Sequence, residues 1–267
     1  MNTGDYLKVM QQAKAAGTTI ICPYCGAKTL GLPSGTICGN CENLISTQSG
    51  GRYGSPQYIS SMEGIHDSIR KKSYAEAYPA FERLIGMPED PFLLYTEALA
   101  YIENSNFETT LISYDKQGFM EENIAHRNAS ISLLSTAKML LNKAVYLSET
   151  NGKGDISMAY LQFLAYLKLG DLKAADDAAG KLKGSTPLLE NYSQMLLANA
   201  MGNYPKVLEY ADSLLVRDTF SINALYYSAY ALFKKGDRKV AKTLLAEFLA
   251  VAESESANRL KDVLHDL

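Results

Sequence analysis

Gly170-Asp171, Gly202-Asn203 and Gly236-Asp237 are three copies of one turn, spaced by 32 and 34 residues, and each lies between two apolar helical segments. Glycine can end a helix in the left-handed conformation, and the Asp or Asn that follows can accept the first N–H bonds of the next helix. Weaker copies stand at Lys72-Ser73 and Ser105-Asn106, which are 33 residues apart. The recurring turn therefore predicts a chain built from helical hairpins of similar length.

Other positions keep the same register. Helix starts are predicted at Asp90-Pro91 and Thr186-Pro187, because proline suits the first helical position behind a capping side chain. Small residues that would allow close helix packing recur five positions after the turns, at Ala77, Thr110, Ala175, Val207 and Ala241. The pattern resembles tetratricopeptide repeats, a family with a 34-residue helix–turn–helix period, over most of residues 58–252. The resemblance implies a mainly α fold, a TPR-like α-solenoid of antiparallel helix pairs.

One segment departs from this period. Ser105 and Gly170 lie about two periods apart, but no turn occurs midway between them. Residues 121–149 instead show a nearly unbroken helical pattern, which predicts an overlong, irregular helix inside the repeats. At the C-terminal end, residues 253–267 predict a capping helix, because the last repeat of a solenoid leaves an apolar side that needs cover.

Four cysteines form a second pattern near the N-terminus. Cys22 and Cys25 are separated by two residues, as are Cys38 and Cys41, and twelve residues lie between the pairs. A Cys-x-x-Cys turn brings two sulfurs close enough to share one ion, and two such turns joined by a hairpin complete a tetrahedral S4 cage. Gly39, inside the second pair, can adopt a positive φ that lets backbone N–H groups approach the thiolates.

The cysteine pattern resembles a zinc ribbon over residues 18–45. The resemblance implies a small β module that holds one Zn²⁺ ion through all four cysteines. The ion would be structural, because four thiolates leave no open position for water or substrate. A module of this size also buries too little apolar surface to fold without its metal. Iron is an alternative occupant, since S4 ligation fits both metals.

Two other uses of the cysteines compete with metal binding. The tetrapeptide Cys22-Pro23-Tyr24-Cys25 also matches the active site of glutaredoxins. A redox dithiol of that kind lies at the start of a helix, however, and the Gly- and Pro-containing residues 26–35 do not favour one. Disulfides are disfavoured because no charged-then-apolar segment marks the chain for export.

Composition and charge bound the rest of the chain. It has 267 residues, of which 47% are hydrophobic and 21% are charged, and this is typical of a folded globular protein. No apolar stretch is long enough to cross a bilayer, so we expect a soluble, cytoplasmic protein without membrane contact. Residues 46–57 are rich in Gly and Ser and predict a flexible linker between the ribbon and the repeats. Residues 1–17 predict a short N-terminal helix with one apolar side.

Tyrosines recur on the predicted first helix of each pair. They lie ten residues before four of the five turns, at Tyr95, Tyr160, Tyr192 and Tyr226. The resemblance to tetratricopeptide repeats implies that this offset faces the concave groove, where Tyr230 and Phe233 would extend the row. Phenol rings there could bind an extended peptide or a partner helix. Packing between the helices of the repeat itself is the alternative use of these positions.

The sequence identifies no catalytic residues. His66, His126 and His265 stand apart, and the motifs of metalloproteases, serine hydrolases and phosphate-binding loops are missing. We therefore expect a non-enzymatic adaptor or scaffold, in which a structural zinc head accompanies a groove that binds a peptide or a partner protein. Self-association is a further form that such binding could take.

A zinc-ribbon component of a nucleic-acid complex, in transcription, translation or another RNA process, is the alternative function. Residues 1–57 carry a formal charge of +2, and a zinc ion held by four thiolates contributes about −2, which leaves the head neutral. The whole chain has a net charge of −3. Because phosphate binding scales with the available cationic side chains, these charges argue against general affinity for nucleic acid.

Overall fold

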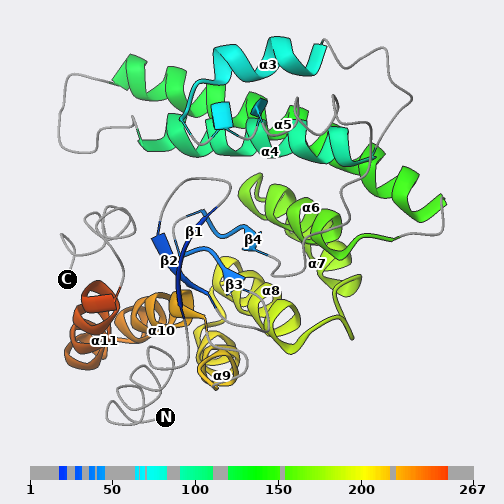
Figure 1. The fold of residues 1–267 in the computed structure, drawn as a ribbon. Coiled ribbons are helices and arrows are strands. Elements are labelled where there is room, and N and C mark those ends of the chain that lie inside the picture. The colour runs from blue at the N-terminus through cyan, green and yellow to red at the C-terminus, as the bar shows by residue number, and fades with distance from the viewer. Residues whose placement is uncertain are drawn as a thin grey trace. The chain divides into compact units, whose positions relative to one another are not determined.

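The computed structural model describes residues 18–22, 28–31, 36–39, 41–45, 64–65, 67–69, 71–82, 91–110, 120–150, 154–216 and 221–251. The predicted N-terminal helix at 1–17, the linker at 46–57 and the capping helix at 253–267 lie outside the described residues. The described chain is mainly helical and carries two small antiparallel β-hairpins (Figure 1).

The chain divides into two units. Residues 1–50 and 179–267 form the first, here called the ribbon unit, and residues 51–178 form the second, here called the long-helix unit. The helices of the long-helix unit are α3 (Tyr74–Glu82), α4 (Pro91–Thr110), α5 (Met120–Thr150), α6 (Ile156–Lys168) and α7 (Leu172–Gly180), whose last two residues fall in the ribbon unit. Helix α3 packs on α4, α4 packs on α5, and α5 packs on α6.

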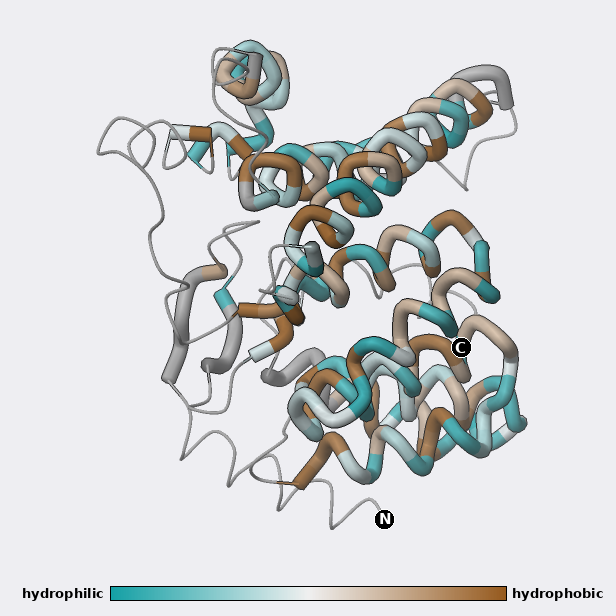
Figure 2. The backbone as a smooth tube through the Cα atoms, turned by 90° about the vertical axis from the view of Figure 1, so that its right-hand side faces the viewer, coloured by the Kyte–Doolittle hydropathy of each residue, from teal (hydrophilic) through white to brown (hydrophobic). Residues whose placement is uncertain are grey.

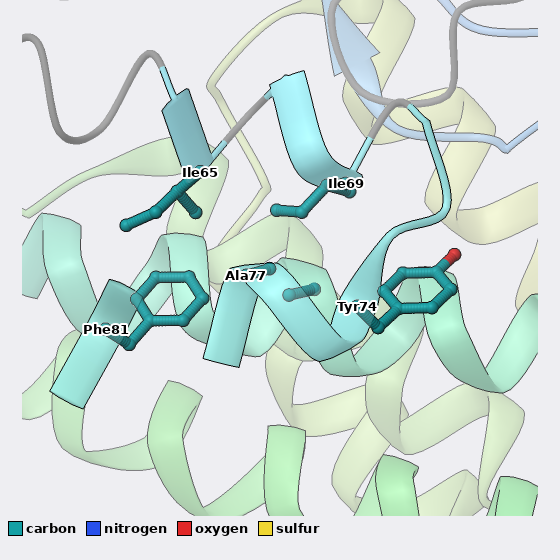
Figure 3. Close-up of a cluster of buried hydrophobic side chains, with 6 residues drawn as sticks. Ile65, Ile69, Tyr74, Ala77 and Phe81 are labelled. Carbon is teal, nitrogen blue, oxygen red and sulfur yellow. The ribbon is translucent and has the colours of Figure 1, made fainter. Parts of the chain in front are cut away.

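An apolar cluster lies at the start of the long-helix unit. Ile65 and Ile69, on a short helical segment before α3, face Ala77 and Phe81 of α3 (Figure 3). All four side chains are buried, and Ala100 of α4 belongs to the same cluster. Burial of apolar surface therefore holds the first helical hairpin of this unit together.

The two weak copies of the turn behave differently. Lys72 adopts a φ of 58°, and the amide of Ser73 donates to the carbonyl of Ser68 at 2.9 Å, so that this copy does end a helical segment. The turn predicted at Ser105-Asn106 is wrong, because both residues lie inside the continuous helix α4. The buried hydroxyl of Ser105 lies 2.7 Å from that of Ser130 on α5, and this packing favours continuation of the helix.

Helix α5 is the long helix of its unit. It has 31 residues, which corresponds to a length of about 46 Å, and it occupies the segment for which the sequence predicts an overlong helix. Its buried side is formed by Leu134, Ala137, Leu141 and Ala144. Ala144 belongs to an apolar cluster with Met158 of α6, against which Leu94 of α4 packs.

The ribbon unit begins with two β-hairpins. β1 (Thr18–Ile21) pairs with β2 (Lys28–Gly31), with Thr18 opposite Gly31. β3 (Thr36–Ile37) pairs with β4 (Leu44–Ile45), with Thr36 opposite Ile45. In the sequence, each hairpin encloses one of the Cys-x-x-Cys turns.

Four helices complete the ribbon unit: α8 (Pro187–Ala200), α9 (Tyr204–Leu214), α10 (Ile222–Lys234) and α11 (Arg238–Val251). Consecutive helices from α8 to α11 pack on one another, and α10 also contacts α8. The predicted start of α8 is confirmed, since the Thr186 hydroxyl accepts the N–H of Leu189 at 3.3 Å just before the proline at the first helical position. Hydrophobic and hydrophilic residues alternate around the helices, as expected where one side of each helix is buried (Figure 2).

The three strong copies of the turn are confirmed. At Gly170-Asp171, Gly202-Asn203 and Gly236-Asp237, the glycine has a φ of 74°, 70° and 92°, respectively. The Asp or Asn side chain accepts the backbone N–H three residues further on, at 3.2, 3.4 and 3.4 Å. The small residues five positions after the turns are fully buried at Ala77, Ala175, Val207 and Ala241. The local chemistry of the repeat is therefore as the sequence predicts.

Candidate metal centre

Three cysteine side chains meet in the ribbon unit. The Sγ atoms of Cys22, Cys38 and Cys41 all lie within 4.8 Å of one another, and these side chains are 0%, 0% and 6% exposed. The fourth predicted ligand, Cys25, lies outside the described residues. The three sulfurs are therefore placed to share one ion.

The spacing of two of these sulfurs fits a common ion. Cys22 Sγ lies 3.8 Å from Cys41 Sγ. Two thiolates bound to one zinc ion at about 2.3 Å in tetrahedral geometry lie about 3.8 Å apart, whereas a disulfide holds its sulfurs about 2.05 Å apart. The donor set and its burial therefore suit a closed metal site.

The two hairpins position the cysteines. Cys22 directly follows β1 and Cys38 directly follows β3, while Cys41 lies in the turn toward β4. The turn between β3 and β4, which carries Cys38 and Cys41 and is here called the second knuckle, is closed by two backbone hydrogen bonds. The amide of Cys38 donates to the carbonyl of Asn43 at 2.9 Å, and the amide of Glu42 donates to the carbonyl of Cys38 at 3.0 Å. The side-chain amide of Asn43 also points a donor at Cys41 Sγ, at 3.4 Å, which favours the thiolate form that a metal requires.

In the described part of the second knuckle, Glu42 has a positive φ of 63°. Gly39, for which the sequence predicts such a conformation, does not adopt it. This conformation costs a non-glycine residue about 1 kcal/mol. The Glu42 side chain is 6% exposed, and its Oε1 accepts hydrogen bonds from the hydroxyl of Tyr227 at 2.7 Å and from that of Tyr192 at 3.2 Å. These bonds to a carboxylate offset the cost of the turn.

Asn223 connects the same helices to a cysteine. Its side-chain amide donates to the carbonyl of Cys38 at 3.2 Å and to the hydroxyl of Tyr192 at 2.8 Å, and the residue is 2% exposed. Asn223 and Tyr227 lie one turn apart on α10, and Tyr192 lies on α8. We call Glu42, Tyr192, Asn223 and Tyr227 the knuckle network. It fastens the second knuckle to α8 and α10.

The predicted groove residues of the ribbon unit have different environments. Tyr192 is 0% exposed, and its hydroxyl belongs to the knuckle network. Tyr226, Tyr230 and Phe233 are half-buried on α10. The ring of Tyr226 lies edge-on to that of Tyr227 at 5.0 Å, Tyr230 lies edge-on to Tyr204 at 6.3 Å, and Lys234 and Arg238 place their cations 5.8 and 5.6 Å from the Phe233 ring.

The other two predicted groove residues lie in the long-helix unit. Tyr160 of α6 is 1% exposed, and its ring lies 6.2 Å from that of Phe163. Tyr95 of α4 is half-buried and packs against the cluster that contains Val145 and Met158. For Tyr160, as for Tyr192, the burial agrees with the packing role that was the alternative use of these positions.

Glu42, Asn223 and Tyr227 were not identified from the sequence. Asn223 and Tyr227 do carry a signal, because they stand four residues apart on one side of a helix and Asn223 interrupts the otherwise apolar start of that helix. Glu42 carries none, since a single carboxylate beside a cysteine is ordinarily a surface residue.

A second polar cluster lies between α3 and α4. The rings of Tyr78 and Tyr101 stack at 4.8 Å, and Asn104 donates to the hydroxyl of Tyr78 at 3.0 Å. Burial raises the pKa of Tyr78 and also raises the pKa of the Glu97 carboxyl above its ordinary value of 4.5. Glu97 is thus easier to protonate in the folded protein than in the unfolded chain.

No helix among the described residues combines the length and the apolar character that a membrane crossing requires.

Comparisons with known proteins do not assign the chain to a family. No protein-family model matches the chain, no curated protein matches it, and no solved structure matches it.

Proposed function

We propose that the chain is a non-enzymatic interaction adaptor, in which one structural zinc ion holds a ribbon that supports helical repeats of the tetratricopeptide type. The cluster of three buried cysteine sulfurs is the observation that carries this proposal. Cys22, Cys38 and Cys41 are three of the ligands, and Cys25 is the fourth. Four thiolates fill the coordination sphere of zinc, so the ion stabilises the fold and has no position for a substrate.

Zinc is the metal we assign to this site. Thiolate ligands suit zinc and iron alike, but zinc does not change its oxidation state and is the common occupant of closed S4 sites in small β modules. The ribbon offers little apolar surface of its own, and metal binding supplies folding free energy that such a module lacks. The described part of the site thus has the composition of a structural centre.

An exposed apolar stripe on α5 supports the adaptor role. Ile124, Ile131, Met139 and Tyr146 are 51%, 56%, 65% and 64% exposed. They are spaced by seven, eight and seven residues, which places them along one side of the helix. Exposed apolar side chains in a row are typical of protein-binding surfaces, and aromatic and Met side chains are enriched there. We assign this stripe to a protein or peptide partner.

The experiment that tests the proposal compares three baits in a pull-down from the source cell extract. Wild-type protein is expected to enrich a defined protein partner, and the double substitution Met139→Ser with Tyr146→Ala is expected to lose it. Lys173→Ala, an exposed change on helix α7, is the control and should retain the partner. Binding to generic oligonucleotides that weakens with added salt, without a protein partner, would instead support the nucleic-acid alternative.

A further inference from the structure

We infer that Tyr192, Asn223 and Tyr227 form an internal docking site for the second knuckle, through which helices α8 and α10 set the metal affinity of the cysteine cluster. The inference rests on the proposed metal site. It assigns positioning roles to three residues that lie 150 to 185 positions away from the knuckle residues they bind.

The docking site binds one feature of the knuckle, the carboxylate of Glu42. Two phenol hydroxyls, from Tyr192 and Tyr227, donate to the same carboxylate oxygen of Glu42. Tyr192 in turn accepts from Asn223, so the bonds run in series from amide to phenol to carboxylate, an arrangement in which each bond strengthens the next. The ligand that fits this surface is an acidic side chain on a left-handed turn.

The same site reaches the metal ligands through one carbonyl group. The oxygen of Cys38 accepts the amide of Glu42, which closes the knuckle, and also accepts the side chain of Asn223. Both lone pairs of that oxygen are therefore engaged when the knuckle is docked. Asn223 holds the carbonyl of a metal-ligand residue in the position that the closed turn requires.

Metal binding and docking are coupled by this geometry. A metal ion holds Cys38 and Cys41 in the turn that presents Glu42 with its positive φ, whereas a metal-free chain of this kind loses its fixed conformation. Docking therefore favours the metal-bound knuckle. By reciprocity, docking strengthens metal binding by the same factor as the metal strengthens docking, so a substitution that weakens docking must also weaken metal binding. Outer-shell partners of metal ligands typically change metal affinity by about 10- to 100-fold.

Zinc retention by the full-length protein tests the inference. Wild type, Tyr227→Phe and Tyr230→Phe are loaded with zinc and titrated with a chromogenic zinc chelator, and the helical content is checked by circular dichroism. We expect Tyr227→Phe, which removes only one hydroxyl, to raise the zinc dissociation constant about tenfold. Tyr230 lies three residues further along α10, where its ring packs edge-on to Tyr204, and Tyr230→Phe should match the wild type.

Two further measurements keep the outcome decisive. Glu42→Gln retains a side-chain oxygen for the phenols and should keep more zinc affinity than Glu42→Ala. In the wild type, removal of zinc should speed hydrogen exchange in the first turn of α10, around Asn223. Wild-type zinc affinity in Tyr227→Phe, together with unchanged exchange at Asn223 after zinc removal, would overturn the inference. A wild-type protein that binds no metal would overturn the proposed metal site itself, and metal analysis identifies that case separately.

Discussion

The hydroxyl of Tyr227 donates a 2.7 Å hydrogen bond to the carboxylate of Glu42, a residue 185 positions earlier that directly follows Cys41. The bond is buried, and it joins the cysteine cluster to a helix at the other end of the sequence. The ribbon and the C-terminal helices α8 to α11 therefore belong to one compact unit. Stability measured in those helices should respond to changes in the ribbon.

Glu42→Ala should destabilise the ribbon unit by about 2 kcal/mol, because two buried phenol donors lose their acceptor. Alanine would also keep the cost of the positive φ at this position without the bonds that offset it. Urea unfolding monitored by tyrosine fluorescence gives the free energy of unfolding. Glu76→Ala, an exposed change in α3, is the matched control. Equal stability of the two variants would show that the knuckle network contributes nothing.

Gly202→Ala should destabilise the protein by about 1 kcal/mol, because an alanine side chain disfavours the φ of 70° found there. Gly180→Ala is the matched control. A Cβ added at residue 180 or at residue 202 would meet no atom within 4 Å, but Gly180, at the end of helix α7, has no positive φ. Thermal unfolding should show a lower midpoint for the first variant only. A similar midpoint for both variants would argue against the left-handed turn.

Glu97→Gln should stabilise the long-helix unit at neutral pH and have little effect near pH 4. Burial raises the pKa of Glu97 in the folded state. The stability that protonated Glu97 contributes is therefore fully present below the pKa of the unfolded state. It is lost as the pH rises through the pKa of the folded state. Thermal midpoints of wild type and variant, measured between pH 4 and pH 7.5, should diverge as the pH increases. A constant difference across this range would contradict the assignment.

Substitutions along the stripe of α5 should separate binding from stability. Ile131→Asn and Met139→Ser replace side chains that are 56% and 65% exposed, so each is expected to change the free energy of unfolding by less than about 0.5 kcal/mol. The same changes should weaken partner capture, because an interface loses its buried apolar contacts. Isothermal titration with the captured partner supplies the affinity. Strong destabilisation by either change would place these side chains in a core instead.

The sequence predicts the features of this chain that depend on neighbouring residues. Gly202-Asn203 shows why, since the positive φ and the capping bond are both set within one turn of chain. Ser105-Asn106 shows the limit of the rule. Neither residue has glycine's freedom, and contact between Ser105 and Ser130 of the next helix favours the continuous helix instead.

The candidate site divides in the same way. The Cys-x-x-Cys spacing predicts Cys22, Cys38 and Cys41 as candidate ligands, and the structure brings their three sulfurs together. The bonds from Tyr227 and Asn223 to the knuckle leave no such local pattern. They depend on how two segments that are 185 residues apart in the chain pack together. No motif or residue spacing in the sequence indicates that contact.

Metal content of the purified protein is the most direct test of the central claim. Elemental analysis and native mass spectrometry of wild type are expected to give one zinc ion per chain. Cys38→Ser should lose that zinc and lose protection from hydrogen exchange in β3 and β4, while Ser34→Ala, a conservative change between the two cysteine pairs, should keep both. A wild-type protein that contains no metal and still has a folded ribbon would contradict the account.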